Sequence, residues 1–345
     1  MARTFTPEEA VERYLNERKA NLSDSTIYNY KSNLGLFTDW CQYQSHISHI
    51  SDIDQFDISD FKMHKRDEAE VADTTLYNAM MTLRTFIKWC ESKGLLEGLS
   101  ENIMLPDRGR AARTETIEPD TAGEILDHLE KYEYATYQHV LFALLWDAGL
   151  RIGAVRSLDL GDYHSAEAYI ELHHRPGTGD GESLNKNRGT PLKNKEDSER
   201  EVNLHDWVVE VIDDYIDGRR TEITDKAGRR PLLTTNQGRP ARTTLRRHIR
   251  ARTRPCEYSG ECPAGRNIED CEATKWKNAP DCPESVKPHS IRRSAITAWL
   301  NEGHSKELVS DRMDVSPDVL EEHYDQRTEE EKRRLRRELF EMDSR

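Results

Sequence analysis

Three residues near the carboxyl end of the chain have the types and spacing needed for phosphoryl transfer. His289 and Arg292 are three residues apart at the start of a predicted helix, so both lie on one helix face. Tyr324 follows on a further predicted helix. An imidazole can exchange protons, a guanidinium can bind two phosphate oxygens at once, and a phenol can attack phosphorus. The pattern therefore predicts a tyrosine nucleophile acting on a phosphate ester.

A second guanidinium is expected to complete this site. Negative charge gathers on the nonbridging oxygens during in-line displacement at phosphorus, and two fixed guanidinium groups would stabilise it. Arg151, which follows a predicted helix end at Gly149, is the candidate partner of Arg292. We expect His289 to act as a general acid and base, because the ordinary pKa of histidine is about 6.5. Tyr324 must lose its phenolic proton as it attacks.

The sequence resembles the tyrosine recombinase, or phage integrase, family. The segment G-L-R-I-G-A-V-R-S-L around Arg151 is similar to the family's first arginine motif, H-S-I-R-R-S-A-I-T-A-W-L to its H-x-x-R motif, and H-Y-D at 323–325 to its nucleophile motif. The resemblance covers essentially the whole chain, and the acidic, Arg-rich composition is similar to that of haloarchaeal XerC/XerD-like integrases. It implies a covalent 3′-phosphotyrosine intermediate and a free 5′ hydroxyl.

The resemblance also implies a proton donor and exposes two departures. In the family a lysine on a β-hairpin protonates the leaving 5′ oxygen, and Lys193 is the candidate here, with Lys195 left open. Ala154 stands where the family usually has a glutamate. Val315 stands nine residues before Tyr324, where the family has a histidine or tryptophan. Because the loss of one such donor costs roughly 10²-fold to 10³-fold in rate, valine would weaken catalysis without excluding it.

The expected fold is mainly α with a small antiparallel β-sheet. Helical patterns fill the first hundred residues, with Thr6 as a helix cap and an apolar stripe of Leu76, Met80, Leu83, Phe86 and Trp89. Alternating segments at 168–173 and 200–204 predict two strands joined by a long polar hairpin. The family resemblance makes residues 1–105 a helical SAM-like core-binding domain, 106–117 a basic linker and 118–345 an α+β catalytic domain with a Cys-rich insertion at 256–282.

Basic residues predict a double-stranded DNA partner. Between Gly218 and Pro255 there are twelve Lys or Arg residues and two acidic ones, within a chain whose net charge is −14. A helix in this segment is expected to lay one face on phosphates. The candidate DNA-binding residues are Arg108, Arg110 and Arg113 in the linker, and Arg242, Arg246, Arg247 and Arg250 in this helix.

Four cysteines are crowded into one loop. Cys256, Cys262, Cys271 and Cys282 could hold a structural zinc ion as four thiolates, although their spacing lacks the tight C-x₂-C turns of common zinc sites. Disulfides or plain thiols are the alternatives. Cys41 and Cys90 stand alone among apolar neighbours and are expected to be buried.

The composition predicts a halophilic cytoplasmic protein. Acidic residues outnumber basic ones by 64 to 50, and arginine outnumbers lysine by 34 to 16. No segment has the length and apolarity of a membrane span or a signal peptide.

The sequence thus predicts a site-specific DNA recombinase that works as a homotetramer on paired sites. No metal or nucleotide cofactor is expected in the reaction, because the phosphotyrosine bond conserves the energy of the broken phosphodiester. Two alternatives stay open: a catalytically silent DNA-binding protein of the same fold, and a type IB topoisomerase-like enzyme that only relaxes DNA.

Overall fold

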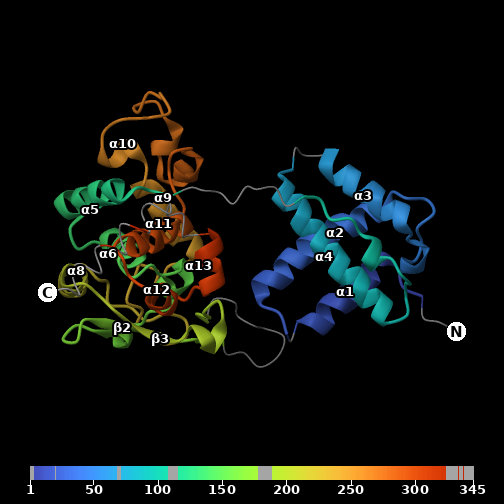
Figure 1. Ribbon diagram of the computed structural model, residues 1–345, viewed down its shortest axis with the longest axis horizontal. Coiled ribbons are helices and arrows are strands. Elements are labelled where there is room, and N and C mark those ends of the chain that lie inside the picture. The colour runs from blue at the N-terminus through green and yellow to red at the C-terminus, as the bar shows by residue number, and fades with distance from the viewer. Residues whose placement is uncertain are drawn as a thin grey trace. The chain divides into compact units, whose positions relative to one another are not determined.

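The computed structural model describes residues 4–19, 21–67, 71–107, 116–177 and 189–323, together with Arg333 and Arg337. The chain divides into two units, Met1–Thr114 and Glu115–Arg345 (Figure 1). The division falls inside the predicted linker at 106–117, of which residues 108–115 lie outside the described residues.

Within its described residues, the first unit has four α-helices and two short 3₁₀ turns. The helices are α1 (Pro7–Arg18), α2 (Asp24–Gln42), α3 (Gln55–Asp67) and α4 (Asp73–Ser92). Thr6 caps α1 in a reciprocal capping box with Glu9, so the predicted helix start is confirmed. In the predicted stripe of α4, four side chains are buried in the core and Trp89 packs against it. Cys41 and Cys90 are buried there too, as expected.

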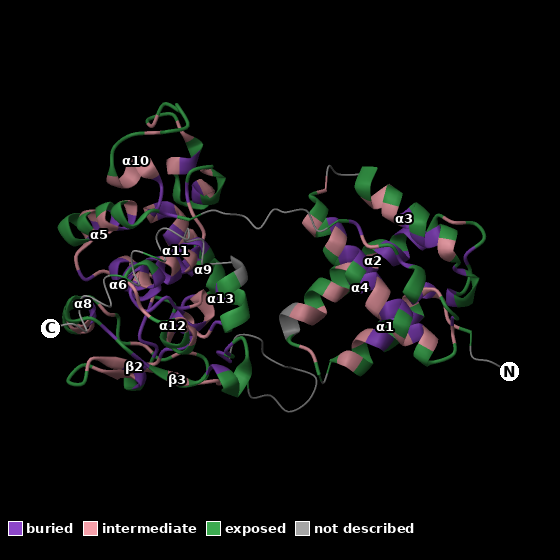
Figure 2. Ribbon diagram, in the orientation of Figure 1, coloured by how far each residue is buried: buried purple, intermediate pink, exposed green. Residues whose placement is uncertain are grey.

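The second unit is a helical domain with a small sheet at one edge. Its described helices are α5 (Pro119–Glu133), α6 (Tyr137–Trp146), α7 (Ile152–Ser157), α8 (Asp206–Gly218), α9 (Arg242–Arg252), α10 (Pro255–Tyr258), α11 (Pro288–Asn301), α12 (Lys306–Met313) and α13 (Pro317–His323). The central helix α6 is surrounded by α5, α8, α9 and α11 and is buried on nearly every side, whereas the outer helices expose one face (Figure 2).

The sheet has three antiparallel strands in the order β1 (Tyr163–His164), β2 (Tyr169–Leu172) and β3 (Arg200–Asn203). In the β2–β3 pair, Ile170 lies opposite Val202, and both side chains enter the core. The two predicted strands and their antiparallel pairing are therefore confirmed, while the short strand β1 was not predicted. The mainly helical fold class with a small sheet is likewise confirmed.

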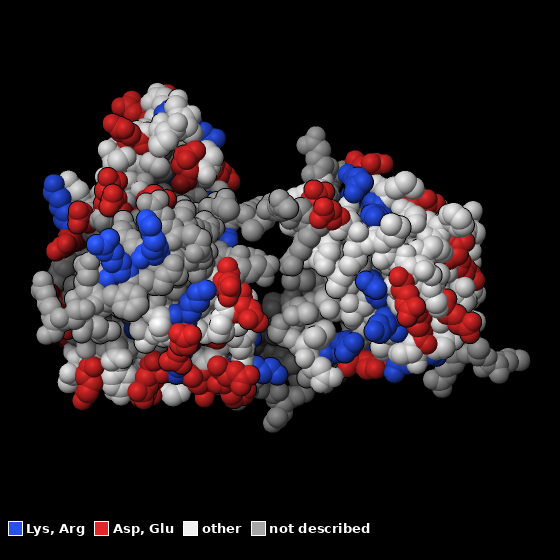
Figure 3. Space-filling model, viewed as in Figure 1, with Lys and Arg blue, Asp and Glu red and all other residues white. Residues whose placement is uncertain are grey.

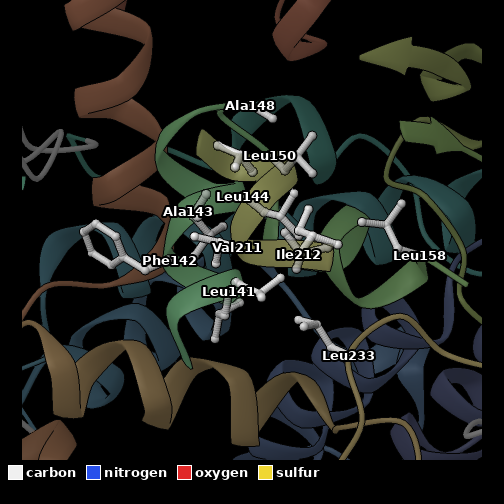
Figure 4. Packing of buried hydrophobic residues seen from close by; sticks show 14 of the residues in the cluster. Leu141, Phe142, Ala143, Leu144, Ala148, Leu150, Leu158, Val211, Ile212 and Leu233 are labelled. Carbon is white, nitrogen blue, oxygen red and sulfur yellow. The ribbon is translucent and has the colours of Figure 1, made fainter. Parts of the chain in front are cut away.

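Aliphatic side chains from α6 and α8 form the centre of the second unit's core. Figure 4 shows Leu141 and Leu144 of α6 lying against Val211 and Ile212 of α8, all nearly or fully inaccessible to water. Because burial of each such side chain contributes roughly 1.5 to 3 kcal/mol, this cluster fixes the end of α6, from which Arg151 follows. None of the described helices combines the length and the apolar composition that crossing a bilayer requires.

Candidate active site

The turn after α6 places Arg151. Gly149 has a φ of +57°, and a Cβ built on it would lie only 2.6 Å from Sδ of Met313. Both the left-handed backbone and the close approach of Met313 therefore require glycine at this position. The turn ends at Arg151, which is the residue just before α7, with its side chain one quarter exposed.

Arg292 approaches the same place from α11. Its residue surface is only 2% exposed, and Nη1 donates a 2.6 Å hydrogen bond to the carbonyl oxygen of Gly149. Nη2 donates to the carbonyl oxygens of Met313 and, at 3.2 Å, of Asp314. Carbonyl oxygens thus accept three hydrogen bonds from this buried guanidinium.

The two predicted phosphate-binding arginines are brought together by the structure. Nη2 of Arg151 donates a 2.5 Å hydrogen bond to the carbonyl oxygen of Asp314, the same atom that Arg292 contacts. Segments far apart in the chain therefore place two guanidinium groups around one oxygen atom. Such a pair can hold a phosphate bidentately.

His289 lies in the first turn of α11, one turn before Arg292. Part of the His289 surface is exposed to solvent. The surrounding protein still removes some water from the ring, and this partial burial is the largest cause of a pKa below the ordinary value of 6.5. Four nearby cations lower the pKa further: Arg292, Arg293, Lys193 and Arg151. Burial and these cations therefore favour the neutral ring, which is the form able to accept a proton.

Lys193 lies in the long connection between β2 and β3, and its charge acts on His289. The backbone N–H of Leu192 donates to Nδ1 of His174 at 3.1 Å, and Thr190 pairs with Arg175 in an isolated β-bridge. Lys193 and Lys195 are both exposed. Lys193, unlike Lys195, is among the cations that lower the pKa of His289. We call Arg151, Lys193, His289 and Arg292 the arginine cradle.

Val315 and Tyr324 complete the set of predicted catalytic positions. Val315 is 7% exposed and belongs to a hydrophobic cluster with Ile296, Leu300 and Leu320, so its side chain serves packing. Helix α13 ends at His323, and Tyr324 lies outside the described residues. The linker arginines Arg108, Arg110 and Arg113 also lie outside them.

Three polar residues at the cradle were not predicted. The carboxylate of Asp314 accepts hydrogen bonds from Arg151, Ser198 and Asn194. The only sequence signal was an aspartate in the segment before the nucleophile, next to Val315. Asn194 and Ser198 gave none, because a polar loop residue looks the same whether or not it contacts a site.

Several arginines of the basic segment 218–255 form ion pairs within the fold. Arg239 forms ion pairs with Asp159 and, at 2.8 Å, with Asp225, and Arg229 pairs with the same two aspartates. Together with the pair of Arg175 and Asp162, these residues form what we call the arginine–aspartate network. Ion pairs within the fold therefore take up part of the basic charge of the segment 218–255, and its contact with DNA stays a prediction. On the face shown in Figure 3, Lys and Arg side chains lie among Asp and Glu.

The four candidate arginines of α9 have different surroundings. Arg242 and Arg246 are exposed, and Arg246 has no ion-pair partner within the described part of the chain. Arg247 lies 5.8 Å from the ring centre of Trp276. Arg250 donates to the carbonyl oxygen and the hydroxyl of Ser285, so it also anchors the segment leading to α11.

The four clustered cysteines are free thiols with partly exposed side chains. Among the described residues, which include all four, no group of three or more His, Cys, Asp or Glu side chains is placed to hold a metal ion. Zinc binding has no support from this arrangement and stays a prediction. Buried Arg254 braces the segment instead, with a 2.6 Å hydrogen bond to the carbonyl oxygen of Ala273.

Comparison with known proteins identifies the first unit. The sequence profile of the phage integrase N-terminal SAM-like domain matches residues 11–94. No curated protein matches the chain in sequence.

Solved structures resemble the chain over nearly its whole length. The Tn1549 transposon integrase in complex with a circular intermediate DNA superposes with a TM-score of 0.70 at 13% identity, covering 97% of this chain and 99% of that one. A lambda integrase dimer bound to a COC′ core site gives a TM-score of 0.62 at 13% identity, covering 95% and 97%. At these identities the likeness establishes the fold.

Proposed function

Because this chain has the tyrosine-recombinase fold, with a SAM-like domain of the phage-integrase type at its start, we propose that it is a site-specific DNA recombinase. Its substrate is double-stranded DNA, and its reaction is cleavage and rejoining of strands through a covalent 3′-phosphotyrosine at Tyr324. The observation that carries the proposal is the meeting of Arg151 and Arg292 at one oxygen atom, with His289 and Lys193 close by.

The cradle and Tyr324 together supply the groups for an in-line displacement at phosphorus. Arg151 and Arg292 bind the nonbridging oxygens and stabilise the charge that gathers there. The phenolic oxygen of Tyr324 forms a bond to phosphorus, and neutral His289 accepts its proton. The bond from phosphorus to the 5′ oxygen breaks, and Lys193 gives that oxygen a proton. Attack by a 5′ hydroxyl reverses these steps, so no nucleotide is consumed.

Assembly on DNA follows from the same proposal. Strand exchange joins two duplexes, and each cleaved strand needs its own tyrosine. We therefore propose a homotetramer on paired sites. The solved relatives are a DNA complex of the Tn1549 integrase and a DNA-bound dimer of lambda integrase.

Two rival functions share the fold. A silent DNA-binding protein is favoured by Val315, whose buried side chain gives no hydrogen-bond donor to the site. A relaxing topoisomerase would use the same chemistry on one duplex. The DNA products distinguish all three functions: a covalent adduct separates an enzyme from a silent protein, and rearranged plasmids separate a recombinase from a topoisomerase.

The decisive experiment traps the covalent intermediate. A bound duplex would be selected from random sequences and nicked next to the cleavage point, so that the short 5′ fragment diffuses away. The wild-type chain should form an adduct that survives denaturation, Tyr324→Phe should form none, and Tyr132→Phe, an exposed tyrosine of the same unit, should behave as wild type. Tight binding without an adduct would instead identify a silent protein.

A two-site plasmid separates the remaining pair of functions. A recombinase should convert it into deleted or inverted products, whereas a topoisomerase should only relax it. Relaxation without rearranged products would overturn the proposal in favour of the topoisomerase.

Zinc at Cys256, Cys262, Cys271 and Cys282 remains a separate proposal. Metal analysis of gently purified protein should give about one equivalent of zinc, because a closed four-thiolate site retains its ion. Less than about half an equivalent would remove this proposal and leave the cysteines as plain thiols.

A further inference from the structure

Asp314 sits at the centre of the arginine cradle, although its residue type would not be expected beside a bound phosphate. It ends α12 with φ 48° and ψ 61°, a left-handed conformation that aspartate tolerates better than most residues. Its backbone N–H donates to the carbonyl oxygens of Asp311 and Ser310. The backbone at this position is therefore fixed, and the carboxylate has a defined place.

Three donors from two other segments bind the carboxylate and engage both of its oxygens. Oδ2 accepts from Nη1 of Arg151 and, at 2.7 Å, from the hydroxyl of Ser198. Oδ1 accepts a 3.0 Å hydrogen bond from the side-chain amide of Asn194. Asn194 and Ser198 are joined to each other, because the N–H of Asn194 donates to Oγ of Ser198 at 3.3 Å. One side chain thus ties the Arg151 turn to the loop that carries Lys193.

Arg151 keeps donors for a phosphate while it is held in this way. A guanidinium has five N–H groups, and Asp314 takes one from Nη1 through its carboxylate and one from Nη2 through its carbonyl oxygen. The Nε–H group and one N–H group on each terminal nitrogen remain. The Arg151 side chain is also 25% exposed, whereas that of Asp314 is 14% exposed.

We propose that Asp314 is a positioning residue. It fixes the orientation of the Arg151 guanidinium and its position relative to the loop that carries Lys193. This inference rests on the proposed function and adds to it the residue that aligns two of its catalytic groups. The competing interpretation is that the carboxylate is an internal anion that must leave before phosphate can bind. The engagement of both carboxylate oxygens favours the positioning role, because departure of the carboxylate would break three hydrogen bonds in a mostly buried place.

The two interpretations predict opposite changes when the charge is removed. The test compares single-turnover adduct formation and duplex affinity, with the nicked duplex described above, for the wild type, Asp314→Asn and Asp314→Gly. Both substitutions suit a left-handed backbone, and thermal unfolding of each variant reports whether the fold is kept. Asp311→Asn, a substitution of an exposed aspartate on the same helix, is the matched control.

If Asp314 positions Arg151, both variants should form the adduct roughly 10-fold to 100-fold more slowly at saturating DNA, because a small misplacement of a catalytic group has that effect. Their affinity for the duplex should change by less than about threefold, and Asp311→Asn should match the wild type in both quantities. Asn194→Ala, which leaves residue 314 intact, should slow the reaction less than Asp314→Asn does.

The outcomes distinguish the inference from the function on which it rests. A wild-type chain that binds the duplex without forming an adduct overturns the proposed function. A wild-type chain that forms the adduct, with variants that react equally fast or faster, overturns the role of Asp314 alone. Should Asp314→Asn unfold, Asp314→Gly and Asn194→Ala decide the question by the same two measurements.

Discussion

Two groups of arginines in the second unit are held in opposite ways. In the arginine–aspartate network, Arg239 lies between Asp159 and Asp225 with only 4% of its side chain exposed, so the charges cancel within the fold. In the arginine cradle, burial first and then nearby cations lower the pKa of His289. Arg239 is almost fully enclosed with its carboxylates, whereas Arg151 pairs with Asp314 and still has a quarter of its side chain exposed to a ligand.

The network also serves the cradle. Arg229 donates a 3.0 Å hydrogen bond to the hydroxyl of Thr190, and Arg156 donates at 3.2 Å to the carbonyl oxygen of Gly189. Both acceptors lie just before Lys193 in the chain. A neutral, rigid group of ion pairs thus supports the start of the loop that reaches the charged site.

The largest effect on adduct formation is expected from a substitution of Arg292. Lysine in its place keeps the charge but loses the planar fork that reaches the carbonyl oxygens of Gly149 and Met313. We expect Arg292→Lys to slow adduct formation on the nicked duplex by roughly 10³-fold. Arg266→Lys, on an exposed arginine of the Cys-rich segment, should leave the rate unchanged. A rate within about tenfold of the wild type would show that Arg292 does not contact the phosphate.

A substitution in the network should lower stability and spare the chemistry. Arg239→Met removes the more buried of the two arginines that Asp159 and Asp225 share, while Arg229 remains paired with both, so the free energy of unfolding of the second unit should fall by about 1 to 3 kcal/mol. Urea titration followed by circular dichroism measures this loss. The adduct rate per folded molecule should stay near the wild-type value. A stable variant with a lost adduct rate would contradict the division between the two groups.

Lowering the pH should affect the cradle before the network. Loss of water and four cations hold the pKa of His289 below 6.5, so its base function is present at neutral pH and is lost as the pH falls through that lowered value. Burial acts to raise the pKa of Asp225, but hydrogen bonds from Arg239 and two backbone N–H groups hold it below 3.8. Stability from this group is therefore lost only in stronger acid.

The pH dependence is checked with two measurements on the same samples. The second-order rate constant for adduct formation, which reports the free protein, should have a midpoint below 6.5. The circular dichroism signal should remain native through that midpoint. A midpoint above 6.5, or unfolding that coincides with the loss of rate, would contradict the assignment.

The smallest effect is expected on the surface of α9. Arg246→Gln should weaken duplex binding a few-fold and reduce the slope of log affinity against log salt by about one, because one phosphate contact is lost. Arg250→Gln is the matched comparison, since Arg250 is bonded to Ser285. It should change the salt slope less and lower the unfolding temperature more. Equal salt slopes for both variants would remove the distinction.

Local patterns predicted much of the fold and part of the site. The cap at Thr6, the glycine turn before Arg151 and the spacing of His289 and Arg292 depend on neighbouring residues, and the structure places all of them as such patterns require. Strands β2 and β3 followed from alternation of apolar residues. These features are set by a few consecutive residues, so a sequence can reveal them.

Contacts between residues distant in the sequence could not be predicted. The basic count between 218 and 255 could not reveal that Arg239 would meet Asp159, which lies far earlier in the chain. Asp314 was passed over for the same reason, because its partners Arg151 and Asn194 are distant in sequence. Val315 was recognised as a departure, but only packing shows that its side chain belongs to the core.

The central claim is that the hydroxyl of Tyr324 takes over a DNA phosphate held by Arg151 and Arg292. Proteolysis of the trapped adduct followed by mass spectrometry of the nucleotide-bearing peptide tests it most directly. We predict that Tyr324 carries the 3′ phosphate of the cleaved strand, and that Arg151→Ala and Arg292→Ala yield no such peptide. A nucleotide attached to another residue, or undiminished adduct in both arginine variants, would contradict the account.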